Sequence, residues 1–558
     1  MARGLFLGVA AAFAIAAAPA ARGAVGDQGP GGAAASTVIV DKLVGIVLVA
    51  DPNDVIHAGT PASKGVVIKD VPLLAGSDNL SEKLSRYLGK PLTEAARADI
   101  VFEIVLFYRG HGRPLVNVTT PSQEITGGVL QVLVVEGRVG KIRVDGARWF
   151  DTRTILGKIR TAPGQEIDTN DLNEDLDWIN RNPFRQVDMV YAKGSELGTT
   201  DLVFREMDRF PLRAYTGYEN SGNTLTGNDR LLAGVNWGNA FGLDGEIDYQ
   251  YVTDPQFLYF RAHSLIYTQP LPWRHILTLI GSYAITHGDV PQLFDLNGFN
   301  SQASARYEIP LPKWGAYREA LDAGFDYKRA NNNLAFGGQS VYGGTVDTIQ
   351  WSLGYNASLK DHWGATTMKA TVFYSPGGVT AQDTNAAYDL SRSGAAANYT
   401  YGKLELGRTT GLPFDFTLVN LFTGQLSDAN LLGSEQLGFG GYDTIRGYDT
   451  RIVNADQGLI VSNELRTPPM SLLSLLGIKK HPEDKLQFIG FLDYGLAADK
   501  HLLPGEPATT ALMGAGPGLR YALASHLTVR ADYGWQLLNA PADRTNAMRW
   551  HVGTVLSY

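Results

Sequence analysis

Residues 485–495 read KLQFIGFLDYG, and the way their side chains alternate decides the fold class. Successive side chains of an extended strand point to opposite faces. One face of this strand is apolar and carries Leu486, Phe488, Gly490, Leu492 and Tyr494. The other face is polar and carries Lys485, Gln487 and Asp493. An apolar face for lipid and a polar face for a lumen are typical of a transmembrane β-barrel strand, so we expect Asp493 to point into the lumen.

The same alternation recurs from residue 210 to the C-terminus, with turn clusters between the runs. We predict antiparallel strands near 210–219, 229–239, 243–253, 257–269, 273–286, 299–309, 317–329, 345–358, 364–376, 394–407, 413–425, 457–467, 485–496, 512–522, 525–536 and 546–558. The longer connectors are 287–298, 330–344, 377–393 and 426–456. Long connectors on one side and short ones on the other favour a 16-stranded membrane β-barrel over 209–558, with a long loop at 426–456. The alternative, a secreted soluble β protein, would have to hide many aromatic faces.

Composition excludes several classes of function. The chain has 558 residues, with 48 Lys and Arg against 56 Asp and Glu and a formal net charge of -8. It has no cysteine, which excludes disulfide scaffolds, thiolate metal sites and cysteine nucleophiles. The mild acidity argues against nucleic acid as the main ligand. Beyond the N-terminal segment no apolar run is long enough to cross a bilayer as a helix.

The N-terminus predicts export. Arg3 precedes an apolar stretch from Leu5 to Ala18, and Ala18-Pro19-Ala20 provides a cleavage site of small residues. We therefore predict a signal peptide over 1–20, the alternative being an N-terminal membrane anchor. The Gly- and Ala-rich residues 21–38 are too poor in apolar side chains to pack and are expected to be a flexible linker.

Residues 39–208 predict two small α+β modules with the same order of elements. The first has a strand, helices at 77–89 and 93–108, and strands at 113–118 and 128–135, with Thr93 as a helix cap. The second begins near Lys141 and repeats this order over a unit of ~75 residues, which indicates an array. A single irregular α/β domain is the alternative. Neither module gathers residues of catalytic type.

The long loop and two strands suggest a buried ion pair. Residues 438–450 read GFGGYDTIRGYDT and follow the eleventh strand, so by parity they are extracellular. If this Gly-rich tip folds back into the pore, Arg446 meets Asp493 or Glu464, which lie on the lumenal faces of their strands. A guanidinium removed from water needs a carboxylate and suits bidentate pairing. The alternative is an exposed arginine on a solvated loop.

These segments resemble the BamA/TamA superfamily, and within it the two-partner-secretion transporters (TpsB), such as the filamentous-haemagglutinin and haemolysin transporters. Ile445-Arg446-Gly447-Tyr448 is close to the family's VRGY motif, and Phe491-Leu492-Asp493-Tyr494-Gly495 matches F-x-D-x-G. YLGKPLT at 87–93 and Asn463-Glu464-Leu465-Arg466 also fit. The resemblance covers nearly the whole mature chain, and two modules rather than three or five point to the transporters.

The resemblance implies a fold, a site and a function. It implies POTRA domains at 39–138 and 139–208 in the periplasm, and a 16-stranded barrel in the outer membrane. It implies a loop-lock motif and a lumenal partner motif, formed respectively by Ile445, Arg446, Gly447 and Tyr448, and by Phe491, Asp493, Gly495 and Glu464. The POTRA domains would capture a large unfolded exoprotein, and the barrel would secrete it. Tyr558, the terminal aromatic residue, would be a C-terminal signal for the barrel-assembly machinery. We expect a monomer in outer-membrane lipid, with no nucleic acid, cofactor or metal.

Three other functions compete with secretion. A membrane-protein assembly factor of the BamA/TamA type would use the seam between the first and last strands. An enzyme displayed on a barrel is not expected, because the sequence has no G-x-S-x-G and no H-E-x-x-H, and its ten histidines are scattered. The run GAGPG at 514–518 resembles a nucleotide loop but lies in a strand, so a hairpin or a patch of small lumenal residues is favoured. A passive porin does not explain the periplasmic modules.

Overall fold

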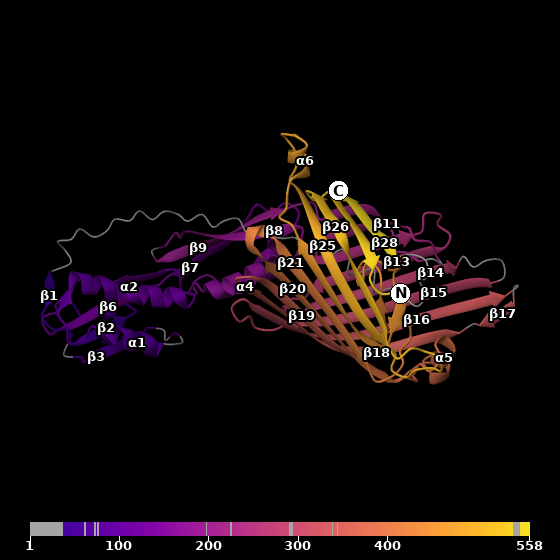
Figure 1. Cartoon of the computed structure of the whole chain (residues 1–558). Helices are drawn as coiled ribbons and strands as arrows, with labels where there is room; N and C mark the ends of the chain where they lie inside the picture. The colour runs from indigo at the N-terminus through magenta and orange to yellow at the C-terminus, as the bar shows by residue number, and fades with distance from the viewer. Residues whose placement is uncertain are drawn as a thin grey trace. The chain divides into compact units, whose positions relative to one another are not determined.

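A computed structural model describes residues 37–60, 63–71, 74, 77–196, 198–223, 226–288, 294–336, 339–342, 344–539 and 547–558. The chain divides after Phe210 into an N-terminal α+β unit and a C-terminal barrel (Figure 1). Residues 1–36, with the predicted signal peptide and most of the predicted linker, lie outside the described residues. Among the helices that the structure describes, none has the length and apolar character needed to cross a bilayer.

The C-terminal unit is a closed antiparallel barrel in which each strand pairs with its sequence neighbours, and β10 pairs with β28. Its sixteen long strands are β10 Leu212–Glu219, β11 Arg230–Ala240, β12 Gly245–Thr253, β13 Phe260–Pro270, β14 Ile276–Gly288, β15 Phe294–Pro310, β16 Tyr317–Phe336, β18 Thr345–Asp361, β19 Gly364–Ser375, β20 Tyr399–Gly411, β21 Thr417–Ser427, β24 Gln457–Arg466, β25 Asp484–Ala498, β26 Thr510–Leu523, β27 Leu527–Gln536 and β28 Met548–Ser557. The short strand β17, Gln339–Tyr342, pairs with the end of β16. The predicted fold class is confirmed.

Two predicted loops are largely strand. The connectors expected at 287–298 and 330–344 are shortened because β15 and β16 continue past the ends of their neighbours and pair with each other throughout. The run Asn331-Asn332-Asn333 suggested a loop, yet its backbone pairs with Phe299, Gly298 and Asn297. By strand parity these strand ends lie on the extracellular side, where we expect polar side chains to be tolerated and the ladder to continue beyond the bilayer.

The first module is a mixed sheet covered by helices. Its sheet has the order β3-β2-β6-β5, formed by β2 Gly45–Val49, β3 Gly65–Lys69, β5 Val116–Thr119 and β6 Val129–Glu136. Two helices, α1 Ser77–Ser85 and α2 Glu94–Gly110, bury leucines and isoleucines against it. The predicted cap is confirmed, because the Thr93 hydroxyl accepts a hydrogen bond from the Ala96 amide at 3.1 Å.

The strand expected at the start of this module is two strands, and a further strand was missed. β1 Val38–Val40 pairs with β4 Leu92–Thr93, while β2 pairs in parallel with β3 and β6. Residues 65–69, GVVIK, contain only three consecutive apolar side chains, Val66, Val67 and Ile68, and such a short run cannot be assigned from periodicity alone.

The second module has the sheet order β7-β9-β8, formed by β7 Arg138–Asp145, β8 Arg185–Lys193 and β9 Thr199–Asp208. Its helices are α3 Thr152–Leu156 and α4 Thr169–Ile179. The Thr169 amide donates to the Gly112 carbonyl of the first module at 2.8 Å, and Leu115 packs into the second module's core. The division into 39–138 and 139–208 stays a prediction, and β7 begins at its border.

The junction of the two modules contains buried charge. Arg113 Nε lies 3.3 Å from a Glu136 carboxylate oxygen, and Arg113 Nη2 lies 3.8 Å from Asp168. Burial raises the pKa of the Glu136 carboxyl in spite of this cation, and burial together with the Glu136 charge raises the pKa of Tyr108. Burial therefore makes the charged state of Glu136 less favourable in the folded protein than it is in water.

Candidate functional site

The connector between β21 and β24 folds into the barrel as a structured loop. Within it β22 Leu437–Phe439 pairs with β23 Val453–Ala455, and the tip lies between these strands. Gly440 and Gly441 have φ of +96° and +104°, which allows the tight turn that starts the tip. The tip contacts the faces of β24 to β28 opposite to the exposed apolar side chains, so it occupies the lumen.

Arg446 is buried at this tip and pairs with the predicted carboxylates. Its Nε and Nη2 atoms donate to the two carboxylate oxygens of Asp493 at 2.7 and 2.9 Å, and its backbone amide donates to the same residue at 3.0 Å. Nη1 donates to Glu464 at 2.8 Å, and Nη2 reaches the Ser462 hydroxyl at 3.3 Å. The guanidinium carbon lies 3.7 Å from the centre of the Phe491 ring. The structure thus brings together both strand carboxylates that the sequence named as partners.

A second arginine completes the charge balance. Arg520 donates to both oxygens of Asp532 at 2.7 and 3.0 Å, and it also donates to Glu464 at 3.3 Å. Arg466 binds the other Glu464 oxygen at 2.7 Å. Three carboxylates and three guanidiniums therefore share one network, in which each charge is hydrogen-bonded, as burial requires. The sequence reasoning did not find Asp532 or Arg520, because isolated charges on alternating strands carry no local motif.

Gly447 and Tyr448 attach the tip to three further strands. The Gly447 amide donates to His551 Nε2 at 3.0 Å, and Gln536 donates to the Gly447 carbonyl at 2.9 Å. The buried Tyr448 hydroxyl donates to the Met513 carbonyl at 2.9 Å. Gly447 has φ of +98°, so its conformation requires glycine. The predicted tip residues are therefore fixed on β26, β27 and β28 as well.

Ile445 gives the lock an apolar centre. It is fully buried in a cluster with Leu437, Phe439, Tyr448, Ala455, Ile460, Ala497 and Leu512. Gly495 leaves room for it, because a Cβ at Gly495 would lie 2.3 Å from the Ile445 Cδ1 atom. The glycine of the F-x-D-x-G motif is thus needed because the Ile445 side chain of the loop tip packs against it.

Two glycines that the sequence did not assign to the site let the tip approach the barrel wall. A Cβ at Gly514 would lie 1.8 Å from the Arg446 carbonyl oxygen, and one at Gly534 would lie 2.4 Å from the Gly447 amide. Such separations exclude any side chain larger than hydrogen. Gly514 begins the GAGPG run, whose small residues were the available signal.

A second buried cluster holds the outer part of the loop. Glu435 accepts from the Tyr401 hydroxyl at 2.8 Å and pairs with Lys328. Asp456 accepts from the Leu431 amide at 2.9 Å and pairs with Arg392, just beyond the helix α5 Asn385–Ser391. Aromatic side chains of α5, β19 and β20 pack beside it: Phe373, Tyr388, Tyr399 and Tyr401. The connector 376–398 and the loop segment 428–436 therefore meet inside the outer end of the barrel.

Tyr558 lies at the end of the closing strand. Its backbone amide donates to the Ala214 carbonyl at 3.0 Å, and its side chain is exposed, as are Trp550 and Leu556. The assembly role of Tyr558 stays a prediction.

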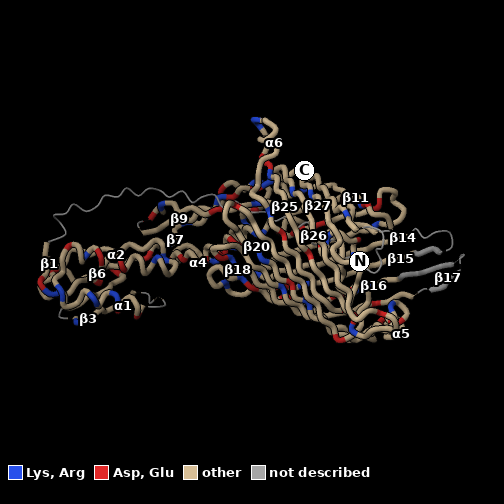
Figure 2. The backbone as a smooth tube through the Cα atoms, viewed as in Figure 1, with Lys and Arg blue, Asp and Glu red and all other residues tan. Residues whose placement is uncertain are grey.

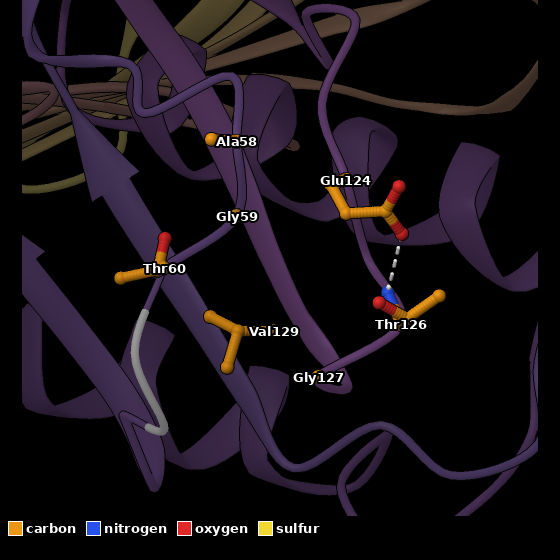
Figure 3. A pocket seen from close by; sticks show the side chains of 7 residues that line it. All are labelled: Ala58, Gly59, Thr60, Glu124, Thr126, Gly127 and Val129. Carbon is orange, nitrogen blue, oxygen red and sulfur yellow. Dashed lines mark hydrogen bonds between the residues drawn. The ribbon is translucent and has the colours of Figure 1, made fainter.

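A small pocket in the first module offers no catalytic constellation. It has a volume of about 290 Å³ and is lined by Ala58, Gly59, Thr60, Glu124, Thr126, Gly127 and Val129 (Figure 3). Glu124 accepts a hydrogen bond from the Thr126 amide at 3.1 Å, and hydrogen bonds from Thr126 lower its pKa. Its carboxylate is thus bound within its own loop. Among the described residues no group of His, Asp and Glu side chains could hold a metal ion.

Comparisons with known proteins agree with this architecture. The family model "Haemolysin secretion/activation protein ShlB/FhaC/HecB" matches residues 198–521. The heme/hemopexin transporter protein HuxB of Haemophilus influenzae is 22% identical over 82% of this chain and 80% of its own length. The outer membrane transporter CdiB of Dickeya dadantii is 24% identical over 62% and 61% of the two chains. The hemolysin transporter protein ShlB of Serratia marcescens is 23% identical over 72% and 71%.

Solved structures show the same fold. CdiB from Escherichia coli superimposes with a TM-score of 0.76 over 95% of this chain and 93% of its own, at 17% identity. CdiB from Acinetobacter baumannii gives a TM-score of 0.65 over 93% and 90%, at 16% identity. The matching family model covers more than half of the sequence. The chain therefore belongs to the ShlB/FhaC/HecB family of haemolysin secretion/activation proteins, and is an outer-membrane two-partner-secretion transporter of the BamA/TamA superfamily with periplasmic POTRA domains.

Proposed function

We propose that this chain captures one large exoprotein in unfolded form through its α+β modules and passes it outward through the barrel. The observation that carries the proposal is the buried Arg446 at the loop tip, held by carboxylates on β24 and β25. A lumen that only admitted solutes would not need a loop bound to five strands. A polypeptide can pass through the lumen only if the loop that occupies it can be displaced as a unit.

The first module offers surfaces suited to an extended chain. β5 is an edge strand of its sheet, with one side unpaired in the described structure, and such an edge can bind a peptide as an added strand. α2 packs next to β5 and exposes Phe102 and Leu106 to solvent. An unfolded exoprotein has the backbone groups for the edge and the apolar side chains for the helix.

The relatives' names supply the class of cargo. HuxB is named a heme/hemopexin transporter, ShlB a hemolysin transporter and CdiB an outer membrane transporter. By analogy the cargo of this chain is a large secreted protein. Because the periplasm has no ATP and the chain has no ATP-binding loop, folding of the cargo outside the cell provides the direction.

A capture experiment tests the modules. A photo-reactive amino acid at Asn117, exposed on β5, is expected to cross-link to the exoprotein in cells, whereas one at Asp51, exposed in a turn of the same module, is not. Equal labelling from both positions, or none from Asn117 during active secretion, would reject strand addition at β5.

A genetic experiment tests the transport step. Deleting the gene is expected to trap one specific large protein in the periplasm and leave other outer-membrane proteins at normal levels. A general fall in outer-membrane barrels would instead support an assembly factor. The short β10–β28 seam, from Tyr215 and Ser557 to Glu219 and Gly553, is the feature that such a factor would use.

A further inference from the structure

The connector between β24 and β25 ends in an exposed apolar tip. A short helix, α6 Leu472–Leu475, lies in this connector and begins at Ser471, whose hydroxyl accepts from the Ser474 amide at 3.0 Å. Its last residue, Leu475, and the next residue, Leu476, are each 67% exposed, and Ile478 is 45% exposed. The α6 connector projects outward from the ends of the strands in Figure 1.

The tip is held in this position by a defined set of hydrogen bonds. The Asp484 carboxylate accepts from the Ser471 hydroxyl and from the Leu473 amide, the latter at 3.1 Å. Met470 and Leu486 exchange two backbone hydrogen bonds at 2.7 and 2.9 Å. These hydrogen bonds attach the connector to β25. Its leucines are therefore exposed while the turn itself is folded.

The other turns at this end of the barrel mark a bilayer interface. By strand parity they lie at the end where β10 begins, which is the periplasmic end. Large exposed aromatic side chains occupy five of them: Phe241, Trp273, Trp314, Trp363 and Phe414. Girdles of aromatic residues mark the boundary between hydrocarbon and headgroups in outer-membrane barrels. The α6 connector lies at the same end of the barrel and exposes leucines and an isoleucine in place of aromatic rings.

The charged residues beside the tip indicate which kind of partner it would bind. Lys479 and Lys480 follow Ile478 directly and are exposed, and Figure 2 shows basic residues at the end of this connector. Apolar side chains followed by cations suit a phospholipid surface, where the side chains enter the acyl region and the ammonium groups meet phosphates.

We propose that residues 471–480 form an interfacial anchor that inserts Leu475, Leu476 and Ile478 into the periplasmic leaflet of the outer membrane and binds phospholipid phosphates through Lys479 and Lys480. The anchor is separate from the transport step. It fixes the membrane depth of β24 and β25, the two strands that hold Glu464 and Asp493.

The absence of cysteine from the sequence makes the test direct. Leu476→Cys carries an environment-sensitive fluorophore in the full chain, in nanodiscs of phosphatidylethanolamine and phosphatidylglycerol. Nitroxide lipids labelled near the headgroup are expected to quench this fluorophore strongly. Aqueous iodide is expected to quench it several-fold less than it quenches the same fluorophore at a control site. The control is Ser525→Cys, exposed in the β26–β27 turn at the same end of the barrel, where no large apolar side chain is exposed. Equal iodide quenching at both sites would overturn the proposal.

A charge variant tests the phosphate contact. In the Leu476→Cys background, Lys479→Glu with Lys480→Glu is expected to reduce quenching by nitroxide lipid, and more in discs with phosphatidylglycerol than in phosphatidylcholine alone. Heat-modifiable migration on gels verifies that the barrel is folded. A tip that stays open to iodide in lipid and becomes shielded only when periplasmic extract is added would show that the partner is a protein and reject the membrane anchor.

Discussion

At the scale of single residues, the buried guanidinium of Arg446 is removed from water, and its charge is balanced by hydrogen bonds to Asp493 and Glu464. Asp493 binds it through two side-chain atoms and the backbone amide, so the carboxylate positions the tip as well as neutralising it. Ser462 donates to the second Asp493 oxygen at 2.6 Å and orients that carboxylate. Removing one member leaves the other buried and uncompensated, which is why such pairs are sensitive to single substitutions.

We expect Arg446→Ala and Asp493→Ala each to abolish most secretion while the barrel still inserts. Breaking a buried pair typically costs roughly 3–5 kcal/mol, and a solvated lumen lowers that value. The measurement is exoprotein in the medium against heat-modifiable barrel in the outer membrane. Arg408→Ala, which breaks a more exposed pair with Asp361, serves as the matched control and should secrete normally.

The pair itself is tested by a double-mutant cycle that includes the swap Arg446→Asp with Asp493→Arg. Coupling is expected between the two alanine substitutions. Strictly additive losses, with no recovery in the swap, would mean that the residues do not interact in function.

Gly514 provides an independent test of the docked tip. Gly514→Val places a side chain where the Arg446 carbonyl lies, so it is expected to expel the tip and raise the conductance of the purified barrel in planar bilayers. Gly490→Val is the control, because a Cβ at Gly490 meets no atom within 4 Å. Identical conductance in the two variants would argue against steric docking at Gly514.

Tyr558 is expected to act before transport. Tyr558→Asp places a charge at the end of a lipid-facing stripe and should lower the amount of inserted protein, with transport per molecule unchanged; Tyr558→Phe should insert normally. Normal levels of heat-modifiable Tyr558→Asp barrel would count against the signal role.

At the scale of elements, the connector that contains α5 and the outer loop segment form one closure. Ala395 forms a parallel β-bridge with Asn430, and both residues are buried. Bridged residues lie close enough for a disulfide. We expect Ala395→Cys with Asn430→Cys to block secretion when oxidised and to recover on reduction, with each single cysteine secreting normally. Secretion by the fully oxidised protein would show that the closure need not open.

Sequence patterns predicted elements where a face had to be apolar. Every long barrel strand was anticipated because lipid requires the alternation seen in KLQFIGFLDYG. β3 was missed because five residues between turns carry no period, and the ends of β15 and β16 were missed because polar residues outside the bilayer can be strand or loop. Asp493 and Glu464 were found through strand parity and a motif, whereas His551 and Gln536 enter the site only through the register of β27 and β28.

At the scale of the whole molecule, the barrel's strand ladder is closed without the modules. Deleting 39–138 is therefore expected to leave an inserted, heat-modifiable barrel that no longer secretes, since the backbone pairing that a membrane demands lies within residues 212–557. Full secretion after this deletion would eliminate the capture role of the first module.

The contacts of the loop tip also impose an order in time. The tip precedes β24 to β28 in the chain, yet it binds Glu464, Asp493, Met513, Gln536 and His551, one on each of those strands. Its complete binding site cannot exist until the last strand has been placed, so the tip docks at the end of biogenesis. A chain that stalls before β28 joins the sheet would leave Arg446 hydrated and open to protease. The contacts that hold the loop tip in the finished transporter can therefore form only when the barrel is complete.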